Sequence, residues 1–126
     1  MTRKIISTDQ APAAIGPYSQ ANAAGGFLFT AGQIPLDPAT MEIVGETAAD
    51  QARQALTNAK AVVEAGSLTL DNVIKVTVFI RDMGEFAAIN EVYLTFFTGE
   101  PPARSVVEVS GLPKDVLVEI EMIAYG

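Results

Sequence analysis

The chain has 126 residues, a formal net charge of −7, and neither cysteine nor histidine. A chain of this length is expected to form one domain, residues 1–126, and to bury roughly two-thirds of the surface that its unfolded form exposes. The missing residue types exclude zinc sites built on Cys or His, thiol nucleophiles, Ser-His-Asp triads and haem ligation by histidine. Catalysis therefore has to use carboxylates, Arg, Lys, Tyr, hydroxyls or backbone amides, and we expect no metal and no cofactor.

The acidic charge also limits the partners that we expect. It repels phosphate backbones, and no run of Lys or Arg interleaved with aromatic residues offsets it, so nucleic acid is not an expected partner. No apolar stretch is long enough for a signal peptide or a membrane-spanning helix. These features predict a soluble cytoplasmic protein with no membrane partner.

The first third of the chain alternates short extended segments with turns. A strand is predicted at residues 4–7, and Pro and Gly make residues 11–20 a loop that presents Tyr18 directly after Pro17. A second strand is predicted at residues 27–31 and ends at Gly32. Residues 33–36 continue extended up to a turn at Asp37 and Pro38.

A helix is predicted between Thr47 and Gly66. Thr47 can cap its first turn toward Asp50, and Gly66 supplies the stop. Apolar residues recur at helical spacing between these ends: Ala52, Ala55, Leu56, Ala59, Val62 and Val63.

A strand and a second helix follow. The period of two in residues 73–80 places Ile74, Val76, Val78 and Ile80 on one face, with Lys75 and Thr77 on the other. Asp82 and Glu85 resemble a capping box, and an apolar stripe follows at Phe86, Ile89, Val92, Tyr93, Phe96 and Phe97. Such a stripe is typical of a helix that packs on a core.

The last two strands are predicted at residues 105–109 and 116–125. The second has one wholly apolar face and one mixed face that carries Glu119 and Glu121. If the two strands form a hairpin with their apolar faces aligned, Arg104 lies on the mixed face, opposite Glu119 or Glu121. A mixed face can be an ordinary solvated face, a subunit interface, or a site for chemistry. Apolar side chains among its charges favour contact with a partner.

The order of strands, helix, strand, helix and strands predicts an α+β fold, a mixed sheet with both helices on one face. A Ser-Lys dyad of Ser105 and Lys75 is conceivable by residue type, but nothing in the sequence brings the two together.

Several motifs, in the same order, resemble the RidA group of the YjgF family, the reactive enamine/imine deaminases. The resemblance runs nearly end to end. It rests on APAAIGPYSQ at residues 11–20, AGQIP at 31–35, QARQAL at 51–56, VTVFI at 76–80, PARS at 102–105, GLPKD at 111–115 and VEIE at 118–121.

The resemblance implies a homotrimer with a fold like that of the trimeric chorismate mutase, its sheets lining a central barrel and its active sites lying between subunits. It implies hydrolysis of 2-aminoacrylate and 2-aminocrotonate, by way of their imines, to 2-oxo acids and ammonia. Such an enzyme is a 2-iminobutanoate/2-iminopropanoate deaminase, which acts on C=N bonds and takes part in metabolite damage control.

The family's site residues carry over to five positions. Arg104 is expected to bind the substrate carboxylate, and Glu119 to orient and polarise the attacking water. Tyr18 is expected to reach the cleft from the adjacent subunit. Gly32 is expected to offer its backbone amide, and Asn90 to face the cleft.

Three departures bear on substrate breadth, which the sequence leaves open together with the physiological imine. Val106 stands where many members have Cys, Ala31 stands where Ser is frequent, and the loop at residues 98–102 is shorter than in some members. Two alternative functions also remain, a non-catalytic small-molecule-binding or regulatory trimer and, against the acidic charge, an endoribonuclease.

Overall fold

The computed structural model describes residues 2–126, which form two layers, a mixed sheet and two helices. The helices are α1 (Ala48–Ala65) and α2 (Phe86–Phe96). The strands are β1 (Lys4–Ile6), β2 (Ala21–Ala24), β3 (Phe27–Thr30), β4 (Val73–Ile80), β5 (Ala103–Glu108) and β6 (Val118–Tyr125). Across the sheet they follow the order β1-β2-β3-β6-β4-β5.

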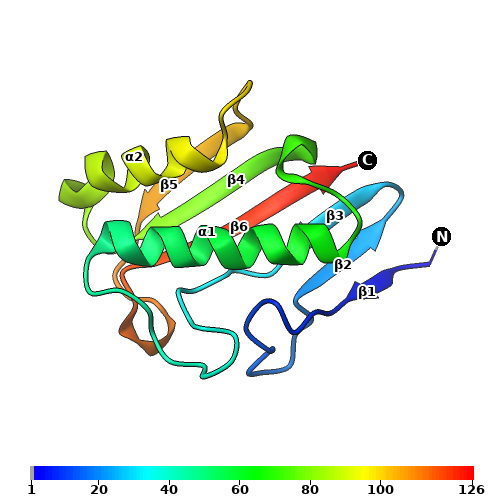
Figure 1. Cartoon of the computed structure of the whole chain (residues 1–126), viewed down its shortest axis with the longest axis horizontal. Coiled ribbons are helices and arrows are strands. Elements are labelled where there is room, and N and C mark those ends of the chain that lie inside the picture. Colours follow the sequence, from blue (N-terminus) through cyan, green and yellow to red (C-terminus); the bar gives the residue numbers. More distant parts are fainter. Residues whose placement is uncertain (1) are drawn as a thin grey trace.

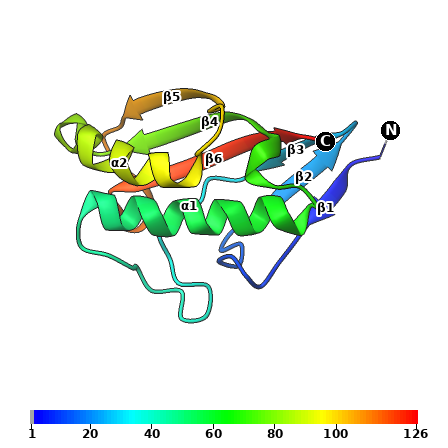
Figure 2. The same ribbon diagram turned by 45° about the horizontal axis from the view of Figure 1, so that its top comes forward.

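Both helices pack on the same face of this sheet, side by side (Figures 1 and 2). We call this the helix face, and the opposite side, which no helix of residues 2–126 covers, the open face. The predicted α+β architecture with two helices on one face is therefore confirmed. Neither helix combines the length and hydropathy that crossing a membrane requires.

Alternation along the central strands builds the core. In β6, Val118, Ile120, Met122 and Ala124 are buried on the helix face, and the residues between them are more exposed. Their antiparallel partners in β4 include Val76, Val78 and Ile80, which are also buried. Ile74 departs from the predicted pattern because a bulge between Val73 and Lys75 interrupts the pairing and leaves its side chain 46% exposed.

Helix α1 begins and ends where the sequence predicts. The side chain of Thr47 accepts a hydrogen bond from the backbone N–H of Asp50, and Gly66 is the C-cap. The start of α2 differs from the prediction. Asp82 caps a separate 3₁₀ turn at Met83–Glu85 by accepting from Gly84 N–H, and α2 begins after this turn with no side-chain cap of its own.

Strand β2 was not predicted from the sequence. It lacks the β-branched and aromatic residues typical of strands, and it forms a hairpin with β3 through Gly25 and Gly26, whose φ angles are 58° and 86°. Backbone of this kind strongly favours glycine.

The predicted hairpin of the last two strands is wrong. β5 pairs with β4 in parallel, and β4 separates it from β6. Arg104 lies beside Val76, on the helix face, whereas Glu119 lies beside Phe79, on the open face. Within one chain the two predicted site residues are therefore on opposite sides of the sheet.

Candidate active site

The residues expected to form the site fall into two groups. Tyr18, Gly32 and Glu119 line one cavity of about 360 Å³. Arg104 and Asn90 contact each other elsewhere, at the edge strand β5 and helix α2. We call these groups the carboxylate half-site and the arginine half-site.

The carboxylate half-site is mostly apolar. Besides its three predicted members, the cavity is lined by Ile15, Ala31, Ile34 and Pro113. Glu119 is thus a carboxyl group among hydrocarbon side chains, with Tyr18 as the other titratable member. Ala31 adds a methyl group to the wall, where a serine would add a hydroxyl.

Gly32 leaves the space that the Glu119 carboxyl group occupies. A Cβ atom at position 32 would lie only 2.8 Å from Glu119 Cδ, which is closer than real Cβ atoms approach. The amides on either side of Gly32 are used, because Ala31 N–H donates to Gln20 O and Gln33 N–H donates to Ile120 O. The Gly32 amide donates to no acceptor within residues 2–126.

The environment of Glu119 favours its protonated form. Burial raises the pKa of the Glu119 carboxyl group above its ordinary value of 4.5, and the negative charge of Glu121 raises this pKa further. Both effects disfavour the carboxylate, the first because a charge loses solvation and the second because like charges repel. A raised pKa makes the ionised carboxyl group a stronger proton acceptor than an ordinary glutamate.

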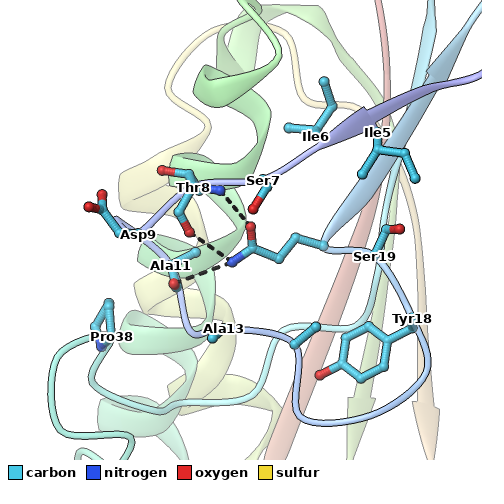
Figure 3. Close-up of a pocket in the computed structure, with 12 residues that line it drawn as sticks. Ile5, Ile6, Ser7, Thr8, Asp9, Ala11, Ala13, Tyr18, Ser19 and Pro38 are labelled. Carbon is cyan, nitrogen blue, oxygen red and sulfur yellow. Dashed lines mark hydrogen bonds between the residues drawn. The ribbon is translucent and has the colours of Figure 1, made fainter.

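Tyr18 is held in a loop that the side chain of Gln20 anchors. The Gln20 amide nitrogen donates to Thr8 O, Ala11 O and Pro12 O, and its oxygen accepts from Thr8 N–H. Figure 3 shows the bonds to Thr8 and Ala11, with Tyr18 within the bend of its own loop. Ile15 N–H donates to the Tyr18 hydroxyl over 3.3 Å. Tyr18 therefore shares a cavity with Glu119 of its own chain, and its approach to a neighbouring subunit stays a prediction.

The connection before β6 also shapes this cavity. Lys114 and Asp115 adopt φ angles of 55° and 58°, which are uncommon for residues with side chains, directly after Pro113 in the cavity wall. Asp115 is paired with Arg81 over 2.8 Å. Strained backbone of this kind is often found beside functional sites.

The arginine half-site holds a cation without an anionic partner. Arg104 is half-buried, and its Nη1 donates to Asn90 Oδ1 over 2.8 Å. Its Cζ lies 4.6 Å from the centre of the Tyr93 ring and 5.5 Å from that of Phe86. No carboxylate of residues 2–126 lies within 4.0 Å of the guanidinium group. Asn90, expected to face the cleft, thus contacts the residue expected to bind the substrate.

A contact that the sequence did not predict lies on the open face. Lys75 Nζ donates to Ser105 Oγ over 2.9 Å, because the parallel register of β4 and β5 brings these side chains together. A Ser-Lys pair needs a dehydrated lysine to act as a base, and this contact is solvent-exposed. Parallel pairing over a distance of 30 residues leaves no local signal in the sequence. Within residues 2–126, no cluster of three or more Asp or Glu side chains could hold a metal ion.

Comparison with known proteins places the chain among relatives of similar length. A family model described as endoribonuclease L-PSP matches residues 8–126. A RutC family protein of Pyrococcus horikoshii is 58% identical over 98% of each chain. The 2-iminobutanoate/2-iminopropanoate deaminase of Escherichia coli K12 is 52% identical over 96% of each chain.

The fold has an equally similar counterpart among solved structures. Escherichia coli TdcF with bound serine superimposes with a TM-score of 0.94, at 52% identity and with 98% of each chain covered. Together with the sequence motifs, these matches show that the chain belongs to the YjgF/RutC family and resembles the RidA-type deaminases within it.

Proposed function

We propose that this protein hydrolyses 2-imino acids, in equilibrium with 2-aminoacrylate and 2-aminocrotonate, to 2-oxo acids and ammonia. The observation that carries the proposal is the Arg104 guanidinium group, which is half-buried and held in place with no carboxylate partner in the described chain. A planar cation with free donors matches a substrate carboxylate, which it can bind through two parallel hydrogen bonds. The identity to an Escherichia coli deaminase of this class supports it.

In the proposed mechanism, the Glu119 carboxylate accepts a proton from water as the water oxygen attacks C2 of the imine. A C–O bond forms, the C=N double bond becomes single, and Glu119 passes the water proton to the nitrogen, which gives a neutral carbinolamine. The Glu119 carboxylate then takes the hydroxyl proton of the carbinolamine and passes it to the same nitrogen. The C–N bond breaks as the carbonyl forms, ammonia leaves and the 2-oxo acid remains, so that imine and water are consumed one for one.

The residues around Glu119 take supporting roles in this mechanism. The raised pKa of Glu119 makes its carboxylate a stronger proton acceptor than that of an ordinary glutamate. The Gly32 amide can donate to the substrate, and the apolar wall of the cavity accommodates a short side chain.

We further propose that the active site is completed between subunits of a homotrimer. Arg104 and Glu119 lie on opposite faces of one sheet, so a single chain cannot bring both to one small substrate. Arg104 and Asn90 of one subunit would meet Tyr18, Gly32 and Glu119 of its neighbour. The open face carries exposed aromatic residues at Phe27, Phe29 and Tyr125, as expected of a surface that a partner subunit covers.

The partners that we propose are the imino acid and identical subunits, without nucleic acid or membrane, in the cytoplasm.

The test of the proposed function is a coupled assay in which a serine or threonine dehydratase generates the short-lived enamine. Adding the protein is expected to speed the decay of the enamine signal and the appearance of the 2-oxo acid. An unchanged decay with intact binding of a 2-oxo acid would indicate a binder instead. RNA cleavage that is lost with rising salt would indicate a nuclease.

A further inference from the structure

Three residues of helix α2 face the guanidinium group of Arg104. Phe86, Asn90 and Tyr93 are four and three positions apart, which places them along one stripe of the helix. Two of them present aromatic rings within 5.5 Å of Cζ, and the third accepts the Nη1 hydrogen bond. We call this stripe the α2 platform.

We propose that the α2 platform positions Arg104 for the substrate carboxylate, and that Phe86, Asn90 and Tyr93 are positioning residues of the reaction. The inference rests on the function proposed above. A free arginine side chain samples many rotamers, so its N–H donors are oriented for two parallel hydrogen bonds to a carboxylate only part of the time. Stacking on aromatic rings restricts the guanidinium plane, and Asn90 fixes its rotation within that plane. The donors that Asn90 does not use are left for the substrate.

In this role Tyr93 acts through its ring. Its hydroxyl oxygen is buried and has no hydrogen-bond partner in residues 2–126. The ring makes its contacts by packing, against Phe97, whose ring centre lies 4.8 Å away, and against Arg104. The hydroxyl group should therefore be dispensable, whereas the aromatic face should not.

The chain offers matched variants for this role. Tyr93→Leu and Phe86→Leu each remove a ring that contacts Arg104. Tyr93→Phe keeps the ring and removes only the hydroxyl group.

The first measurement is steady-state kinetics, together with calorimetric binding of 2-oxobutanoate. Tyr93→Leu and Phe86→Leu are expected to raise KM and the Kd of 2-oxobutanoate by about 3- to 30-fold, the range that a lost cation–π contact covers. Tyr93→Phe is expected to stay within about twofold of the wild type. In an Arg104→Lys background, Tyr93→Leu should add little, because the group it positions is gone. Equal effects of Tyr93→Leu in the two backgrounds would overturn the inference.

The second measurement does not depend on activity. Nitrogen-15 relaxation of the Arg104 Nε–Hε group reports how restricted the guanidinium group is. We expect it to be ordered in the wild type and in Tyr93→Phe, and mobile in Tyr93→Leu or, if that variant does not fold, in Phe86→Leu. An Arg104 that stays equally ordered without either ring overturns the positioning role. If order is lost as expected but no imine is hydrolysed by the wild type, the positioning stands and the proposed function fails.

Discussion

The carboxyl group of Glu119 fits against Gly32, in the space where any side chain at position 32 would begin. This fit explains why a glycine stands two residues after β3, although its φ is not in the left-handed region. The Glu119 carboxyl group can lie this close to the backbone of position 32 only when that residue lacks a Cβ atom.

A first prediction follows for Gly32→Ala. The added methyl group should displace the Glu119 carboxyl group and lower kcat/KM by a factor of about 100, the cost typical of a misplaced catalytic group. The matched control is Gly99→Ala, because a Cβ atom there would meet nothing within 4 Å. The measurement is the imine decay assay on both variants, and equal activity of the two would show that the fit has no functional role.

A second prediction separates the two glutamates of β6. Glu119→Gln should abolish most turnover but leave the Kd of 2-oxobutanoate nearly unchanged, since the carboxylate acts in the transition state. Glu121→Gln should keep turnover. Because the charge of Glu121 raises the pKa of Glu119, its removal should also move the acidic limb of the pH–rate profile to lower pH. Preserved turnover in Glu119→Gln would contradict the mechanism.

A third prediction concerns stability. The folded-state pKa of Glu119 is raised above its ordinary value of 4.5, so the folded protein holds this proton more tightly than the unfolded chain. The contribution of this proton to the free energy of unfolding is fully present below pH 4.5 and is lost as pH rises through the raised pKa of the folded protein. Relative to the wild type, Glu119→Gln should therefore have a higher Tm at pH 7 than at pH 4. A difference of the opposite sign would show that Glu119 gains a favourable partner in the assembled protein.

A fourth prediction concerns Arg104→Lys. An ammonium group cannot donate two parallel hydrogen bonds from a plane, and it stacks less well on Phe86 and Tyr93. Transition-state stabilisation should fall by about 1–3 kcal/mol, as for a lost hydrogen bond to a charged group. Light scattering should show that the Arg104→Lys variant assembles with unchanged mass. Activity of this variant close to that of the wild type would exclude Arg104 as the carboxylate anchor.

Local features of the fold could be predicted from the sequence, but strand pairing could not. The caps of α1 and the extent of β4 depend on residues close in the chain, and both were predicted correctly. The period of two also identified the buried face of β6. It does not reveal which strand lies alongside, so β5 was assigned to the wrong neighbour and Arg104 to the wrong face.

The candidate site, too, could be predicted from the sequence only in part. The resemblance identified Tyr18, Gly32 and Glu119, which the structure brings to one cavity. The contact of Asn90 with Arg104 could not be predicted from spacing, because it depends on how α2 packs on the sheet. The Lys75–Ser105 contact could not be predicted either, because it depends on the parallel register of β4 and β5.

The most direct test of the central claim is complementation between two inactive variants. Arg104→Lys and Glu119→Gln chains are mixed in equal amounts, unfolded and refolded together, and assayed for imine hydrolysis. If each site takes Arg104 from one subunit of a trimer and Glu119 from the next, random assembly restores both residues at about a quarter of the sites. Activity near a quarter of the wild-type value is therefore predicted. Activity no higher than that of the two variants refolded separately would contradict an active site shared between subunits.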